Sequence, residues 1–136
     1  MRIIKGRLSS AFGYRVHPIT KIKSFHNGID IACPIGTPII APGNGRVEQI
    51  INNDVGGLQM FVSVNQERYG FAHLSECLFS VGDTFILGEK IALSGNSGRT
   101  TGPHLHLTHK SGGRWVNGNY EGGKFIDPKS LWEREL

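Results

Sequence analysis

Pro103-His104-Leu105-His106-Leu107 is the stretch that decides the fold. Successive side chains of a β-strand point to opposite faces of the sheet, so His104 and His106 share one face and Leu105 and Leu107 the other. We therefore expect a strand with one face packed on a core and imidazoles on its other face. Two such histidines alone are more often half-exposed strand residues than ligands. The chain holds four further histidines and a well-placed aspartate, which favour a metal site.

Length and composition predict a single β-rich domain. Of the 136 residues, 38% are hydrophobic and 19% charged, a balance that suits one folded core. The 19 glycines are about twice the average share and predict many tight turns, while long helical periodicity is nearly absent. We expect an all-β or strongly β-rich domain over residues 1–136. Cys33 and Cys77 lack C-x-x-C spacing, and we expect two buried free thiols, with a disulfide between them as the alternative.

The charge distribution limits the partners. A net charge of +4 and a pI near 9.3 favour polyanionic surroundings. Lys and Arg are spread along the chain and form no basic block, so we expect no nucleic-acid partner. We interpret the net positive charge as a long-range attraction that steers the protein toward an anionic target. No apolar run approaches the ~20 residues of a membrane span, and residues 1–6 are too short and polar for a signal peptide.

A second informative stretch, residues 25–32, carries His26 and Asp30 on either side of Asn27-Gly28. Asn-Gly is a strong turn signal, so the two side chains should not share a helix face. A turn followed by a short strand can still aim both at one point, and His and Asp are good zinc ligands. The alternative is that Asp30 caps a turn and His26 is exposed.

The remaining elements are predicted from short β-branched runs between glycine and proline turns. We expect strands over 39–40, 47–51 and 58–64 (with Met60, Val62 and Val64 on one face), and a strand that runs into a loop over 69–76. A turn-strand-turn-strand unit is expected over 81–95, a polar loop over 96–102 and a hairpin or loop over 111–123. Residues 6–24 show no clear period and are expected to form a loop. Asp127 and Pro128 predict a short final helix, with Asp127 capping it and Pro128 at its first position.

Three histidines lie outside the two informative stretches. His73 follows apolar residues at an expected strand end, where catalytic side chains are often presented, although a half-buried structural role is equally compatible. His17 stands beside a proline in the expected loop and is interpreted as structural. His109 follows His106 by three residues, so strand parity places it on the opposite face and outside the site.

Together these motifs resemble the M23 family of zinc metallopeptidases, the lysostaphin and LytM-type cell-wall endopeptidases, from about Ser9 to Leu131. The matching motifs are Phe25 to Ala32, Gly36-Thr37-Pro38, Ala72 to Ser75, Val81-Gly82-Asp83, Ser97-Gly98 and Gly102 to His106. Several spaced motifs in the right order are far more specific than any one of them. The resemblance implies a LytM-like (duplicated-hybrid-motif) antiparallel β-sheet core with a long open groove and a short C-terminal helix.

The resemblance also implies the site residues. It makes His26, Asp30 and His106 the ligands of one Zn²⁺ per chain, and His73 and His104 a catalytic pair beside the ion. The chemistry agrees, because three protein ligands leave a position for water, whose pKa zinc can lower to ~7. The sequence has no His-Glu-x-x-His motif, and histidine can replace the missing glutamate base. Our hypothesis is that either His73 or His104 takes the proton from the water and the other donates to the tetrahedral oxyanion.

The implied activity is hydrolysis of peptide cross-links or stem peptides of bacterial peptidoglycan, received as an extended strand. The resemblance leaves open whether the bond lies in a glycine cross-bridge or between D-alanine and a diamino acid. We expect a monomer or part of a larger assembly, acting in the cell wall, the periplasm or outside the cell. A phage particle, a secretion apparatus or a larger parent protein would deliver it.

Within the domain, the sequence departs from the family pattern at two places. The link over residues 65–70 is shorter than the glycine-turned hairpin usual there, which predicts a reshaped groove wall near His73. Residues 115–125 form a longer segment than usual, which predicts a specificity loop.

Three other classes of function compete with this interpretation. An inactive M23-like scaffold that binds or regulates another cell-wall hydrolase would have lost ligands, whereas all five positions are filled. A biotinyl or lipoyl carrier is suggested by residues 41–47 and 81–92, but it needs a lysine on the intervening hairpin and residues 52–70 contain none. A nucleic-acid-binding β-barrel needs clustered aromatic and basic strand positions, which the sequence lacks.

Overall fold

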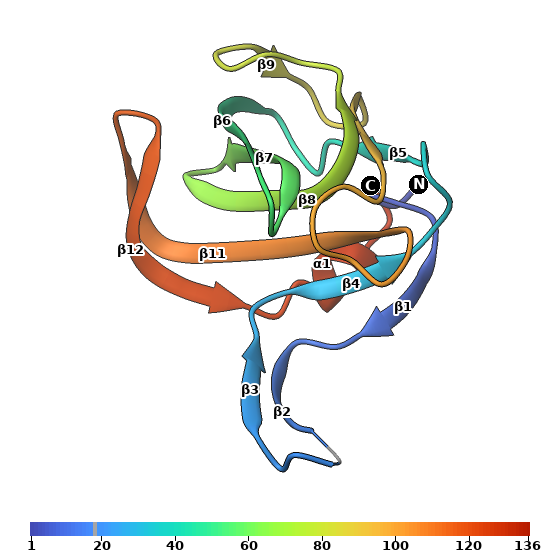
Figure 1. The fold of residues 1–136 in the computed structure, drawn as a ribbon. Helices are drawn as coiled ribbons and strands as arrows, with labels where there is room; N and C mark the ends of the chain where they lie inside the picture. Colours follow the sequence, from blue (N-terminus) through green and yellow to red (C-terminus); the bar gives the residue numbers. More distant parts are fainter. Residues whose placement is uncertain (18) are drawn as a thin grey trace.

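Antiparallel strands make up most of the protein in the computed structural model, which describes residues 1–17 and 19–136 (Figure 1). In chain order the elements are β1 (Arg7–Ser10), β2 (Gly13–Val16), β3 (Lys23–His26), β4 (Ile29–Ala32), β5 (Pro38–Ile40), β6 (Gly45–Asn53), β7 (Gly57–Val64), β8 (Glu67–Cys77), β9 (Thr84–Phe85), β10 (Lys90–Ser94), β11 (His104–Val116), β12 (Asn119–Ile126) and α1 (Lys129–Glu133). The β-rich prediction and the short C-terminal helix are confirmed. Within the described residues, no helix has the length and apolar character needed to cross a membrane.

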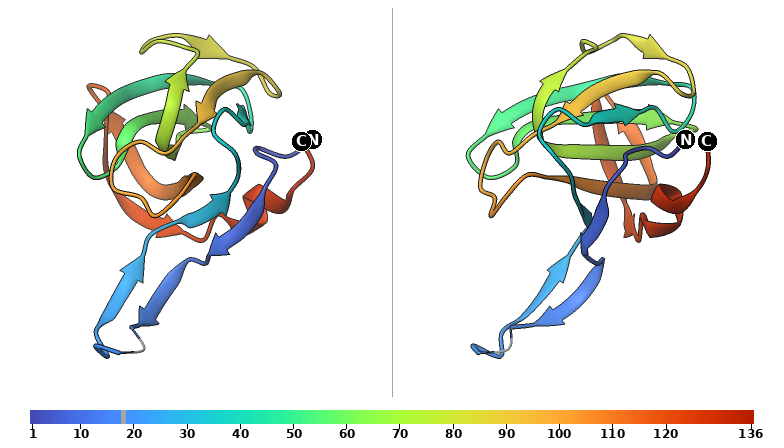
Figure 2. Two further views of the ribbon diagram at one scale, coloured as in Figure 1. Left: turned by 45° about the vertical axis from the view of Figure 1, so that its right-hand side comes forward. Right: turned by 90° about the vertical axis from the view of Figure 1, so that its right-hand side faces the viewer.

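A ten-stranded sheet forms the body of the protein. Its main path runs β1-β4-β11-β8-β7-β6-β9, with β5, β10 and β12 paired beside it. Figure 2 shows that this sheet is strongly curved. Strand β11 lies between β4 and β8, and His106 pairs with Asp30 on one side and with Ala72 on the other. The predicted histidine strand is therefore the central strand at the point where the candidate site forms.

The alternation predicted for residues 104–107 is confirmed. Leu105 and Leu107 are 0% exposed and belong to the core, while His104 and His106 are half-buried on the opposite face. Burying a leucine side chain contributes about 1.5–3 kcal/mol, so the leucine face holds the strand and thereby the imidazoles in place. The single buried face expected for residues 58–64 is also confirmed, because Met60, Val62 and Val64 all lie in the core.

Residues 6–24 do not form the expected loop. They contain β1 and β2, and β2 pairs with β3 to form a separate two-stranded arm that projects from the body (Figures 1 and 2). Its cross-strand pair is Tyr14 and Phe25, whose ring centroids lie 5.0 Å apart, and Phe12 meets the same phenylalanine edge-on at 5.2 Å. Tyr14 is 72% exposed, and the other residues of the arm are also mostly exposed. Because neither face of the arm is buried, its sequence lacks the alternation of apolar and polar residues from which strands are predicted.

The hairpin, one of the two alternatives expected over 111–123, is confirmed, because β11 and β12 pair there, with Trp115 and Tyr120 opposite each other at 5.1 Å. The segment 115–125, expected to be a loop, is therefore part of this hairpin. Two further local predictions needed correction. The N-cap of α1 is Pro128, whereas Asp127 accepts a hydrogen bond of 3.0 Å from the Lys129 amide through Oδ1. Both cysteines are free thiols as expected, but one is only half-buried.

The short link between β7 and β8 is a two-residue hairpin turn. Asn65 and Gln66 both have positive φ, 50° and 68°, which is the geometry of a type I′ turn. The turn continues the right-handed twist of the flanking strands, so β7 and β8 stay paired up to Val64 and Glu67.

Candidate active site

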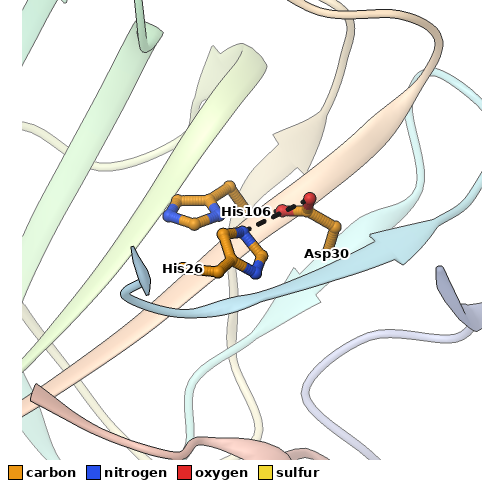
Figure 3. A group of neighbouring side chains, drawn as sticks. All are labelled: His26, Asp30 and His106. Carbon is orange, nitrogen blue, oxygen red and sulfur yellow. Dashed lines mark hydrogen bonds and ion pairs between the residues drawn. The ribbon is translucent and has the colours of Figure 1, made fainter. Parts of the chain in front are cut away.

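The register between β4 and β11 brings Asp30 against the histidine face. His106 Nδ1 lies 2.8 Å from Asp30 Oδ1, and Figure 3 shows the two side chains facing each other. His26 Nε2 lies 3.5 Å from the other carboxylate oxygen, Oδ2. His104 Nε2 lies 3.8 Å from Oδ1. Three imidazoles from two chain segments thus surround one carboxylate.

Gly28 allows the link between β3 and β4 to approach β11. A Cβ atom at this position would lie 2.2 Å from the Leu107 carbonyl oxygen and 3.1 Å from Cε1 of His106. Only glycine fits this contact, which carries His26 alongside the central strand. The Asn-Gly turn signal is thus a bend between strands of two different sheets rather than a hairpin turn.

Backbone carbonyls orient three of the imidazoles. The Nδ1 atoms lie near carbonyl oxygens in the pairs His26–Ala11 (2.8 Å), His73–Ser97 (2.7 Å) and His104–Gly102 (2.8 Å). A carbonyl can only accept, so Nδ1 of each ring carries the hydrogen. In the neutral ring the lone pair is then on Nε2, which is the atom needed for a metal ligand or a proton acceptor.

His106 is oriented the other way round. Its Nε2 lies 3.0 Å from Oδ1 of Asn27, an acceptor, so Nε2 carries the hydrogen and the Nδ1 lone pair faces the Asp30 carboxylate. Two acceptors at 2.8 Å require a cation between them, either a proton or a metal ion. One ligand atom each from His26, Asp30 and His106 lie within 4.8 Å of one another, and all three residues are half-buried. This donor set of two imidazoles and one carboxylate fits zinc.

The charge state of Asp30 suits a metal ligand. Burial opposes its ionisation, but the close contact with His106 and the positive charges that His106, His26 and His104 carry when protonated together outweigh burial. The pKa of Asp30 is therefore held below its usual value. The carboxylate is ionised at neutral pH and can bind a cation.

A bulge in β8 places His73 in the site. Leu58 pairs with Leu74 and Met60 with Phe71, so one residue of β7 opposes two of β8. His73 has φ of 62°, a left-handed conformation that is uncommon for a non-glycine residue. Regular alternation would put its side chain on the same face as buried Phe71. The prediction of a strand end was wrong, because His73 lies within β8 and is turned outward by the bulge.

Ser97 holds His73 in this position. Its carbonyl accepts from the imidazole, and its hydroxyl donates to Leu74 O at 2.6 Å and accepts from Leu58 N at 3.1 Å. A Cβ at Gly57 would lie 2.4 Å from Ser97, so glycine lets the β6–β7 turn pack against it. Burial lowers the pKa of His73, although the hydrogen bond to Ser97 opposes this. The ring lies 4.7 Å from that of His104, centroid to centroid.

All five predicted site residues line one groove of about 680 Å³. Its floor is formed by β4, β8 and β11, which confirms the expected open groove. The two histidines that were left out lie elsewhere. His17 accepts backbone hydrogen bonds near the end of the arm, and His109 contacts Glu67 at 3.1 Å and Tyr69.

Sequence reasoning missed three residues of the site. Asn27, which orients His106, was interpreted only as a turn former, although its position beside a ligand was a usable signal. The carbonyl of Ser97 carries no side-chain signal. Arg68 lines the groove and was not singled out, because its proximity follows from the pairing of β8 with β11.

A His-Asp-His cluster with two further imidazoles lies in a groove on an antiparallel sheet, and this set of side chains suits a catalytic metal centre. The chain belongs to peptidase family M23, whose model matches residues 24–118. It is 43% identical over 115 residues to the peptidoglycan DD-endopeptidase ShyA of Vibrio cholerae, covering 83% of this chain and 27% of that protein. The chain spans 24% to 33% of the length of the first curated relatives it matches.

Solved structures share the fold. The structure of LytU superimposes with a TM-score of 0.73 at 39% identity, covering 93% of this chain and 83% of that one. A zinc-containing peptidase from Vibrio cholerae gives a TM-score of 0.72 at 33% identity, with coverage of 85% and 35%. The LytM-like fold expected from the sequence is confirmed by these similarities.

Proposed function

We propose that this protein is a zinc-dependent endopeptidase that hydrolyses cross-links or stem peptides of bacterial peptidoglycan. The observation that carries the proposal is the convergence of ligand atoms from His26, Asp30 and His106 within 4.8 Å at the floor of the groove. The names of the similar proteins support both parts of it, one being a peptidoglycan endopeptidase and another a zinc-containing peptidase.

In this proposal His26 and His106 bind one Zn²⁺ together with the ionised Asp30. When bound, the ion polarises the scissile carbonyl and acidifies water. His26 contributes Nε2 and His106 contributes Nδ1, because their other ring nitrogens are hydrogen-bonded to Ala11 and Asn27. These outer hydrogen bonds fix the ring orientations, as is usual for metal-binding histidines.

His73 and His104 are the proposed catalytic pair. Each ring holds its Nδ1 hydrogen against a carbonyl and has Nε2 available as a proton acceptor. One of them removes the proton from the attacking water, and the other, when protonated, donates to the oxyanion of the scissile peptide. The lowered pKa of His73 keeps its ring neutral near pH 7, so it suits the base.

The setting of this activity is proposed on the same grounds. Residues 1–136 act as one peptidase domain, either monomeric or within a larger assembly, in the cell wall, the periplasm or outside the cell. The net charge of +4 supports an anionic polymer as surroundings rather than a nucleic acid, because the cations form no stripe.

Removing and restoring the metal tests the proposal. We expect one zinc ion per chain by elemental analysis and hydrolysis of purified peptidoglycan, followed by mass analysis of the released fragments. Chelation should abolish hydrolysis, and added zinc should restore it. Bound zinc without any hydrolysis would instead support the inactive scaffold, and a protein that binds no zinc would contradict the proposed metal centre.

A further inference from the structure

The groove continues past the histidine cluster to Arg68. This residue lines the groove from β8, and its Nη2 donates a hydrogen bond of 3.3 Å to Thr108 Oγ1 on β11. Thr108 follows His106 by two residues on the same strand face. A strand rises about 3.4 Å per residue, so the guanidinium lies near a point about 7 Å along β11 from the proposed metal site.

Aromatic rings hold this guanidinium in place. Its central carbon lies 4.7 Å from the ring centroid of Phe61 and 5.6 Å from that of Phe125, and both rings also line the groove. Stacking on aromatic faces restricts a side chain that is otherwise flexible. The position of the cation is therefore built into the groove wall by β7, β8 and β12.

The cation lacks a counter-ion. Among the described residues, no carboxylate of Asp or Glu lies within 4.0 Å of Arg68, and Asp30 is the only carboxylate lining the groove. Of the five N–H donors of the guanidinium, one bonds to Thr108, while buried Nε has no partner in the described structure. Burial also lowers the pKa of Arg68, which reflects the cost of an uncompensated charge.

We propose that Arg68 is a specificity residue that binds a free carboxylate of the substrate, on the residue next to the scissile bond. This inference rests on the proposed endopeptidase function. A guanidinium offers paired donors that match a carboxylate, and an unpaired half-buried cation gains more from such a partner than a solvated one. The subsite favours a link to a diamino dicarboxylic acid, which keeps a free carboxylate beside the linked amine, over a glycine cross-bridge, because a glycine within a bridge carries no free carboxylate.

Matched peptides test this assignment. The substrates are two synthetic peptides in which D-alanine is linked to a diamino dicarboxylic acid, and they differ only in whether the carboxyl group beside the scissile bond is free or a carboxamide. Hydrogen bonds to charged groups predict that the wild-type protein cleaves the acid with a kcat/KM about 10- to 100-fold higher than the amide. Arg68→Gln should lose this preference by slowing only the acid, and Arg68→Lys should retain part of it. Arg114→Gln, which removes an exposed arginine outside the groove, should behave as wild type.

A binding measurement separates this inference from the proposed function. The diamino-acid product and its amide are titrated calorimetrically into zinc-loaded wild type and Arg68→Gln. A tenfold preference for the acid product that disappears in the variant supports the subsite, whether or not the peptides are cleaved. Absence of cleavage would count only against the proposed endopeptidase activity. The assignment would be overturned if the wild type bound the acid and the amide with equal affinity. It would also be overturned if a folded Arg68→Gln protein lost affinity for both equally, and Arg68 would then be a structural residue.

Discussion

The two faces of β11 each carry a histidine in contact with a carboxylate. On the groove face, His106 Nδ1 lies 2.8 Å from Asp30 Oδ1. On the other face, His109 Nε2 lies 3.1 Å from Glu67 Oε1. Both imidazoles are half-buried, and both contacts are between strands that neighbour each other in the sheet. Judged as isolated pairs, the two are nearly alike.

Their surroundings differ. The carboxylate of Asp30 is shared with His26 and His104, which arrive from β3 and from the start of β11. The His109 ring instead packs on Tyr69, with centroids 4.6 Å apart, and does not line the groove. A histidine–carboxylate contact is therefore not sufficient for a site. The convergence of several chain segments on one carboxylate makes the candidate metal centre.

Alanine at His106 and His109 should produce opposite results. His106→Ala removes a proposed ligand, so we expect loss of bound zinc and a fall in kcat/KM of roughly 10³-fold or more. His109→Ala should keep one zinc per chain and stay within about twofold of wild-type activity, while stability falls by ~1 kcal/mol. Zinc content and peptidoglycan hydrolysis measure both. If the two variants lose zinc alike, the distinction between the faces is wrong.

Removing a proposed catalytic histidine should separate chemistry from metal binding on the groove face itself. We expect His73→Ala and His104→Ala to lower kcat about 10²- to 10⁴-fold, the usual range for general acid–base catalysis, with one zinc still bound per chain. Single-turnover hydrolysis and elemental analysis test this. Loss of zinc in either variant would make that residue a ligand, and unchanged kcat would leave it without a chemical role.

Strand parity was enough to predict one part of the site. The alternation of His104 and His106 with two leucines placed the imidazoles on one face and excluded His109, because local periodicity is what a buried strand face imposes on sequence. The contact of Asp30 with His106 depends on the pairing of segments 76 residues apart. Only the family resemblance brought these residues together before the structure did.

Other parts could not be predicted from periodicity. His73 reaches the groove through a bulge that breaks alternation, and its strained backbone has no side-chain signature in the sequence. The arm of β2 and β3 is exposed on both faces, so no apolar pattern marks it. Arg68 becomes informative only when β8 and β11 are paired and Phe61 and Phe125 are seen to hold it.

The smallest expected effect is on zinc affinity and comes from Asn27, the residue that orients the His106 ring. Asn27 Oδ1 lies 3.0 Å from His106 Nε2, so this side chain directs the Nδ1 lone pair toward Asp30. Asn27→Ala should weaken zinc affinity about 10- to 100-fold, the usual cost of losing a hydrogen bond behind a ligating histidine. Asn27→Asp keeps the acceptor and should preserve affinity, as should Asn119→Ala, an exposed asparagine on β12. Competition with a zinc-binding dye measures all three. Unchanged affinity in Asn27→Ala would mean that the β4–β11 register alone orients the ring, and the two faces of β11 would then differ only in the histidines that gather around Asp30.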